Sequence, residues 1–144
     1  MKITIFLVVL AMQLTAHAES LQEKNKRLVT EFYDMAFNRH EPIKAAHIFL
    51  AENYKQHNPR VADGRKGFIE AFSADSSGGV STTEFKRFIS ENDLVMVHSH
   101  AKQSPQDRGV AVVDIFRVNG EMITEHWDVG QKVSETSKND NTMF

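Results

Sequence analysis

A carboxylate stands where the sequence otherwise indicates buried apolar side chains. Asp114 lies within residues 112–116, whose other members are β-branched or aromatic, and a run of this composition is typical of a strand. A carboxylate removed from water must be paired, protonated or exposed to a cavity. Asp114 is therefore the first candidate for chemistry, as an acid–base group or, if a cation pairs with it, as a brace of the sheet.

The hairpin turn after this strand determines which side chains share the face of Asp114. Asn119-Gly120 lies between two apolar runs and predicts a two-residue turn. In that register the face of Asp114 also carries Phe116, Glu125 and Trp127. One extra residue in the turn would instead bring His126 and Asp128 to this face. We favour the two-residue turn because it places Trp127 in the same cavity as Phe116.

Two histidines occupy the preceding predicted strand, residues 94–102. His98 and His100 are two residues apart, so both point to one face, whereas Val95, Val97 and Ser99 point to the other. With His57 or His126 and an aspartate, these histidines form a donor set for zinc or another divalent ion. No cysteine and no spaced His-Glu helix motif supports that set, so we predict no metal and keep the metal site as a lesser alternative.

The composition and the first residues of the chain limit the class of protein to which it can belong. The chain has 144 residues, no cysteine and a formal net charge of −2, which excludes disulfides and thiol chemistry and gives no basic surface for nucleic acid. Lys2, the apolar residues 3–14 and Ala16-His17-Ala18 predict a secretory signal peptide over residues 1–18, cleaved after Ala18. We expect a periplasmic or secreted protein without a membrane span in its mature chain, made of one domain over residues 19–132 and a polar C-terminal tail over residues 133–144.

Helices come first in the predicted element order, and strands follow. Ser20 begins a capping box, and apolar residues at three- and four-residue steps then predict a long helix. The expected helices span residues 21–38, 42–49 and 65–72, and the expected strands span residues 52–56, 83–90 and 94–102 and the hairpin. This order favours an α+β fold in which three helices pack on one face of one curved, mostly antiparallel sheet.

Three segments make the chain similar to a known family. They are Tyr54-Lys-Gln56-His57-Asn58-Pro59, Asp114-Ile-Phe-Arg117 and Glu125-His126-Trp127-Asp128-Val129. With the element order, they resemble the SnoaL-like polyketide cyclase branch of the nuclear transport factor 2-like superfamily over about residues 21–131. The resemblance implies a conical α+β barrel whose helices close over the concave face of the sheet. It also implies a cofactor-free acid–base site, used in the cyclases for intramolecular aldol condensation.

The family pattern carries over residue by residue to two catalytic candidates, Asp114 and His100. Asp114 would take a proton beside a carbonyl or protonate an alkoxide, and His100 would orient Asp114 or polarise the carbonyl. The expected pocket residues are His57, His98, Phe116, Trp127, Glu125, Tyr54 and Tyr33. Because members of this superfamily usually pair through the outer sheet face, we also expect a homodimer.

Two function classes follow from these expectations. The first is an exported cyclase, isomerase or aldol-type lyase that acts without cofactor on a small, largely apolar carbonyl compound. The second is a non-catalytic protein that binds a small molecule in the periplasm, because an exported protein lies away from the acyl-carrier machinery that makes polyketides. The same fold hosts both classes, so the site must decide between them.

Overall fold

The computed structural model describes residues 19–73 and 82–144. The predicted signal peptide, residues 1–18, lies outside the described residues and stays a prediction. Within the described part of the chain, none of the helices combines the length and the apolar character that crossing a bilayer requires.

The helical segments form where the sequence pattern predicts them. Helix α1, Leu21–Tyr33, begins where the Ser20 hydroxyl accepts a hydrogen bond of 3.2 Å from the backbone N–H of Glu23. It continues as a turn of π-helix, η1, Asp34–Asn38, so the expected helix has the predicted length but ends in wider winding. The other two helices are α2, Pro42–Phe49, with proline at its first turn, and α3, Gly64–Phe72.

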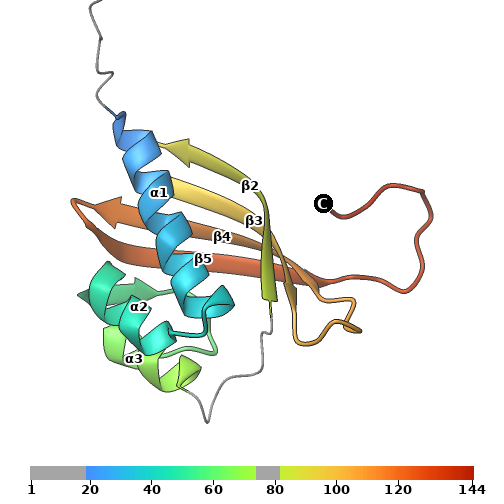
Figure 1. Cartoon of the computed structure of the whole chain (residues 1–144), viewed down its shortest axis with the longest axis horizontal. Helices are drawn as coiled ribbons and strands as arrows, with labels where there is room; N and C mark the ends of the chain where they lie inside the picture. The colour runs from blue at the N-terminus through green and yellow to red at the C-terminus, as the bar shows by residue number, and fades with distance from the viewer. Residues whose placement is uncertain (1–18, 74–81) are drawn as a thin grey trace, which may run out of the picture.

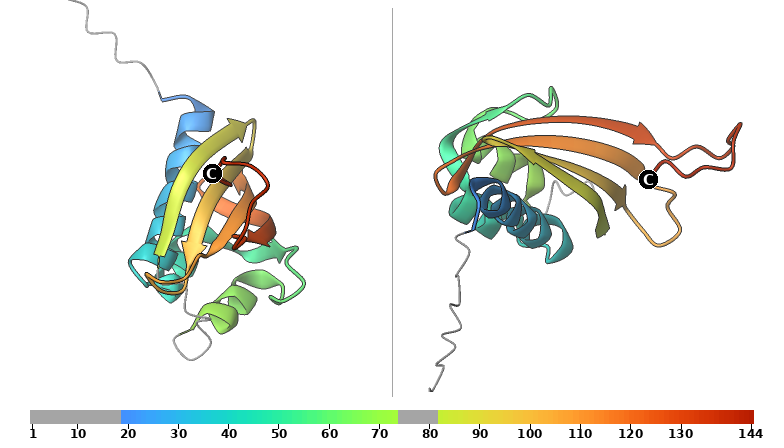
Figure 2. Two further views of the ribbon diagram at one scale, coloured as in Figure 1. Left: turned by 90° about the vertical axis from the view of Figure 1, so that its right-hand side faces the viewer. Right: turned by 90° about the horizontal axis from the view of Figure 1, so that it is seen from above.

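Five strands form one sheet in the order β1-β5-β4-β3-β2. Their bounds are β1 Leu50–Gln56, β2 Thr82–Glu91, β3 Leu94–Lys102, β4 Val110–Asn119 and β5 Met122–Lys132. All neighbours are antiparallel except β1 and β5, which are parallel. The sheet curves around the helices, which lie on one side of it (Figures 1 and 2), and it stays open, with β1 and β2 at its edges. The predicted α+β cone is confirmed.

The core lies between α1 and the concave face of the sheet. Phe32 of α1 is 1% exposed, and its ring lies 5.6 Å from that of Phe68 on α3 and 5.9 Å from that of Phe116 on β4. Val95, Val97 and Ile123 from the sheet are fully buried in the same cluster. These side chains join helices and sheet into one apolar layer that surrounds the site described below.

The register of the β4–β5 hairpin differs from the favoured prediction. Asn119 pairs with Met122, so the turn is Gly120-Glu121, and Gly120 adopts a φ of +65° as the first central residue of a type II′ turn does. Thr124 is then an extra residue, because Val118 pairs with Ile123 but Arg117 pairs with Glu125. This β-bulge turns over every later side chain of β5. The favoured face for Glu125 and Trp127 is therefore wrong. His126 and Asp128 take the face of Asp114, as in the alternative, but the extra residue lies at Thr124 in the strand and not in the turn.

The two histidines of β3 lie on the outer, convex face. Burial alternates along this strand, with Val95, Val97 and Ser99 fully buried, and Val97 pairs with Asp114 across the strands. His98 and His100 share one face, as predicted, but that face points away from Asp114. Val95 and Val97 take the concave face because the core needs apolar side chains there.

Candidate active site

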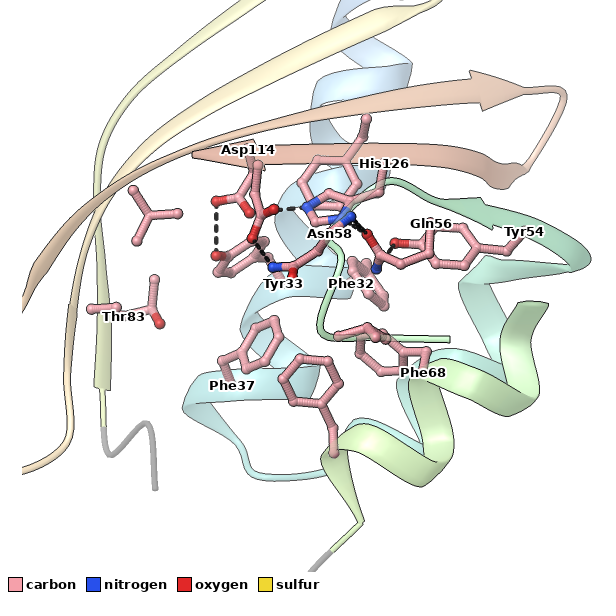
Figure 3. Close-up of a pocket in the computed structure, with 16 residues that line it drawn as sticks. Phe32, Tyr33, Phe37, Tyr54, Gln56, Asn58, Phe68, Thr83, Asp114 and His126 are labelled. Carbon is pink, nitrogen blue, oxygen red and sulfur yellow. Dashed lines mark hydrogen bonds and ion pairs between the residues drawn. The ribbon is translucent and has the colours of Figure 1, made fainter. Parts of the chain in front are cut away.

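A cavity of about 150 Å³ lies between the helices and the concave face of the sheet. Its walls are mostly aromatic, with rings from Phe32, Phe37, Phe68, Phe72 and Phe116 (Figure 3). Polar side chains gather at one end of it: Gln56, Asn58, Asp114, His126 and Asp128. Among the described residues that line the cavity there is no lysine or arginine.

Asp114 is buried at this polar end and is held from two sides. The side chain is on β4, the residue is 4% exposed, and its Oδ2 accepts a 2.9 Å hydrogen bond from the Tyr33 hydroxyl. Its Oδ1 lies 3.0 Å from Nε2 of His126. Burial, reinforced by the neighbouring Asp114 charge, raises the pKa of Tyr33 well above its usual range. Tyr33 therefore stays protonated and donates to Asp114.

His126 lies between two acceptor oxygens, which fixes one of its protons. Its Nδ1 is 3.0 Å from Oε1 of Gln56. That oxygen also accepts from the backbone N–H of Asn58 at 2.9 Å, so this end of the Gln56 amide must be the oxygen and not the nitrogen. Nδ1 of His126 therefore carries a proton. The hydrogen bond between Nε2 of His126 and Oδ1 of Asp114 then requires one further proton, on either of these two atoms.

Asp128 adds a second carboxylate beside this pair. It follows His126 by two residues on β5, and its Oδ2 accepts a 2.7 Å hydrogen bond from Nδ2 of Asn58. One ligand atom each from Asp114, His126 and Asp128 lie within 4.8 Å of one another, so these residues could hold a divalent cation. A cation would have to displace the hydrogen bond between His126 and Asp114, whereas proton transfer uses that bond as it stands.

Three of the predicted site residues other than Asp114 line the cavity, and five point elsewhere. Tyr33, Tyr54 and Phe116 are in its walls, as predicted. The pairing of His100 with Asp114 is wrong, because Nε2 of His100 lies 2.7 Å from the carbonyl oxygen of Arg108 on the outer face. The outer face also carries His98, whose Nδ1 is 2.6 Å from Arg87 and whose pKa is lowered by burial and by that cation.

The remaining predicted pocket residues lie on the outer face, where they form a separate cluster with Arg117. We call this the His57 cluster: His57, Arg117, Glu125 and Trp127. The His57 ring stacks on Trp127 at 4.8 Å, and its Nε2 lies 2.9 Å from Glu125. The hydrogen bond with His57, and then that with Arg117, hold the pKa of Glu125 below its usual range. The bulge at Thr124 places Glu125 and Trp127 here, so their predicted place in the pocket is wrong, as is that of His57.

Sequence reasoning missed the partners that complete the site. Gln56 and Asn58 flank His57 and point into the cavity, whereas His57 points out, which is the alternation of an extended segment. His126 and Asp128 were predicted only in the alternative register. Their spacing of two residues was the available signal, because it puts both on one face together.

The chain is similar to known proteins along most of its length. The model of the SnoaL-like domain family matches residues 29–126. Among solved structures, TsrD from Streptomyces laurentii is 19% identical, with a TM-score of 0.61, over 77% of this chain and 91% of that one. A protein described as a putative ketosteroid isomerase from Kribbella flavida is 15% identical, with a TM-score of 0.66, over 85% and 88%.

A protein described as a putative SnoaL-like polyketide cyclase from a Jannaschia species is 12% identical, with a TM-score of 0.61, over 76% of this chain and 87% of that one. At these identities the structures show a shared fold. No protein with a curated function matches the chain. The family model spans well over half of the sequence. The chain therefore belongs to the SnoaL-like domain family.

Proposed function

We propose that this protein is a cofactor-free cyclase or isomerase in which Asp114 moves a proton on a small carbonyl compound. The observation that carries the proposal is the position of Asp114. It is buried at the polar end of an aromatic cavity, between the Tyr33 hydroxyl and His126. A carboxylate in such a place can act as both base and acid, because its partners stabilise it without removing it from reach of a ligand.

The positions of the protons allow Asp114 to act first as a base and then as an acid. With Asp114 ionised, His126 carries protons on both nitrogens and stabilises the carboxylate. Asp114 then takes a proton from the carbon next to the substrate carbonyl, and the electron pair of that C–H bond moves into an enolate. An isomerase returns the proton to another carbon of the same molecule. A cyclase closes a carbon–carbon bond onto a second carbonyl, and the proton goes to the alkoxide that forms.

Gln56 and the aromatic walls support this chemistry without taking part in it. Gln56 keeps the Nδ1 proton of His126 in place, so only the proton toward Asp114 can move. The phenyl rings exclude water, which strengthens the electrostatic interactions inside the cavity. The Asp114–His126 pair at the polar end has no net charge, and Asp128 adds one further carboxylate. An uncharged substrate therefore suits this end better than an anion.

The experiment measures exchange of hydrogen for deuterium, so it needs no knowledge of the natural substrate. Small cyclic and aryl ketones are incubated in D2O, and loss of the α-proton signal is followed by NMR. Wild type should accelerate the exchange of at least one ketone, and Asp114→Asn should abolish that acceleration. Asp140→Asn, an exposed aspartate of the tail, is the matched control. Ligand binding without exchange for every ketone would instead favour a non-catalytic binding protein.

We also propose that the chain is exported and that it pairs through the outer sheet face. The signal-peptide pattern of residues 1–18 supports export, and protein recovered from its host should begin at Glu19. Recovery of folded protein that still begins at Met1 would reject export. Exposed Ile89 and Val129, on strands β2 and β5, support pairing. Light scattering that gives a monomer mass at all concentrations would reject it.

A further inference from the structure

The cavity is small enough to limit its ligand to about one ring. Its volume is about 150 Å³. A dry, apolar cavity of about this volume, engineered into another protein, binds benzene. A fused two-ring compound would have to push apart walls that are themselves packed into the core, since Phe32 and Phe116 are 1% and 2% exposed.

The walls also favour a flat ring over an aliphatic chain. Phe37, Phe68 and Phe72 form a cluster with centroid distances of 4.6 to 6.4 Å, and two of the three pairs are edge-on. Edge-to-face and offset contacts between aromatic rings are favourable beyond simple burial. A ring placed among these residues can make several such contacts at once.

The polar end of the cavity favours a ligand that carries a hydrogen-bond donor. Oδ2 of Asp128 is held by Asn58, and the other carboxylate oxygen has no partner among the described residues. The lining residues of the described chain include no cation that could bind a carboxylate or a phosphate. An anionic ligand would therefore be repelled, and a hydroxyl group would donate to the open oxygen of Asp128.

We infer that the cavity binds a neutral compound with a single aromatic ring and a hydroxyl group, oriented by a hydrogen bond to Asp128. This inference rests on the proposed function only in that both use the same cavity. It adds what the reaction alone does not specify, namely the size, the charge and one anchoring group of the ligand. In this arrangement Asp128 positions the ring. A carboxylate oxygen of Asp114 lies within 4.8 Å of one of Asp128, so Asp114 can contact the reacting carbon.

Binding of four simple aromatic compounds to the full chain tests the inference by NMR titration. Phenol should bind. Anisole, which has the ring but no hydroxyl hydrogen, should bind about tenfold more weakly, because a hydrogen bond to a charged acceptor is lost. Benzoate should fail to bind because of its charge, and 2-naphthol should fail to bind because of its size. Failure of phenol to bind, or equal binding of phenol and 2-naphthol, would overturn the inference.

Two variants connect this binding to the cavity. Asp128→Asn can keep the hydrogen bond from Asn58. This variant should weaken the binding of phenol about tenfold and leave the binding of anisole unchanged. Ala101→Leu fills the cavity and should abolish phenol binding, whereas Ala111→Leu, on the outer face of β4, should not. Unchanged phenol binding by Ala101→Leu, with the fold intact by circular dichroism, would refute the site. Phenol binding without ketone exchange would leave this inference standing and reject only the proposed reaction.

Discussion

His126 and His100 lie on two strands of one sheet and have opposite surroundings. His126 faces the cavity, is 8% exposed and has both nitrogens within 3.0 Å of side-chain oxygens. His100 faces outward, contacts a backbone carbonyl and stacks on Phe144 of the tail at 4.3 Å. The residue type alone therefore says little about chemistry. What distinguishes the two is the face of the strand, which a single bulge can reverse.

The largest expected difference between the two histidines is in the free energy of unfolding. His126→Ala removes one hydrogen-bond partner from buried Asp114 and one from half-buried Gln56, and should cost about 3 kcal/mol. His100→Ala removes a contact on the outer face and should cost less than about 1 kcal/mol. Urea unfolding of both variants measures the difference. Similar losses would mean that the buried network contributes no more than the outer contact.

Asp114→Asn should separate activity from stability. Any ketone exchange should fall by about 100-fold or more, because the amide cannot accept a proton. Stability should change by less than about 1 kcal/mol, since the Asn carbonyl can accept from Tyr33 and its amide can donate to Nε2 of a neutral His126. A loss of about 3 kcal/mol would indicate that Asp114 mainly braces the sheet. Thermal or urea unfolding at neutral pH supplies that comparison.

Tyr33→Phe should have a moderate effect on both properties. The variant keeps the ring but removes the hydroxyl that donates to Asp114, which should cost about 1 kcal/mol of stability. Exchange should slow as well, because burial keeps this hydroxyl protonated and its loss leaves the carboxylate less stabilised. Tyr54→Phe is the control, since the Tyr54 hydroxyl contacts Gln56 and not Asp114. A larger rate loss in Tyr54→Phe would contradict this arrangement.

The smallest expected effect is on the outer face and depends on pH. The pKa of Glu125 is held below its ordinary value of 4.5 by His57 and Arg117, so the ionised carboxylate stabilises the fold above that value. The contribution is lost as pH falls through the lowered pKa. Glu125→Gln should therefore be less stable than wild type at pH 7 and equal to it near pH 3. Exposed Glu52→Gln is the control, and a deficit that persists at acid pH would contradict the assignment.

The elements of the fold could be predicted because each follows from local patterns. Ser20 and Pro42 mark helix starts, and the apolar steps between Leu21 and Asn38 give the helical face. Strand β3 begins and ends at the predicted residues, 94 and 102. These signals depend on neighbours in the sequence, and tertiary contacts did not override them.

The site could be predicted only in part, because it depends on register. The apolar surroundings of Asp114 indicated burial, and burial was confirmed. Thr124 carries no sequence mark of a bulge, so the partner of Asp114 on β5 was wrong in the favoured register. His100 was predicted as a catalytic residue from the family pattern. The valines of β3 occupy the face that packs into the core, so His100 lies on the opposite face. Gln56 and Asn58 were missed because amides give no chemical signal until their partners are known.

The protonation of His126 tests the pairing with Asp114 most directly. NMR of uniformly ¹⁵N-labelled protein reads each ring nitrogen, with His100 as the internal comparison. The structure predicts that Nδ1 of His126 carries a proton at neutral pH and that this proton persists in Asp114→Asn, because Gln56 holds it. In Gln56→Leu the preference for Nδ1 should disappear. A neutral His126 protonated only at Nε2 in the wild type would contradict this arrangement of protons and, with it, the role given to Asp114.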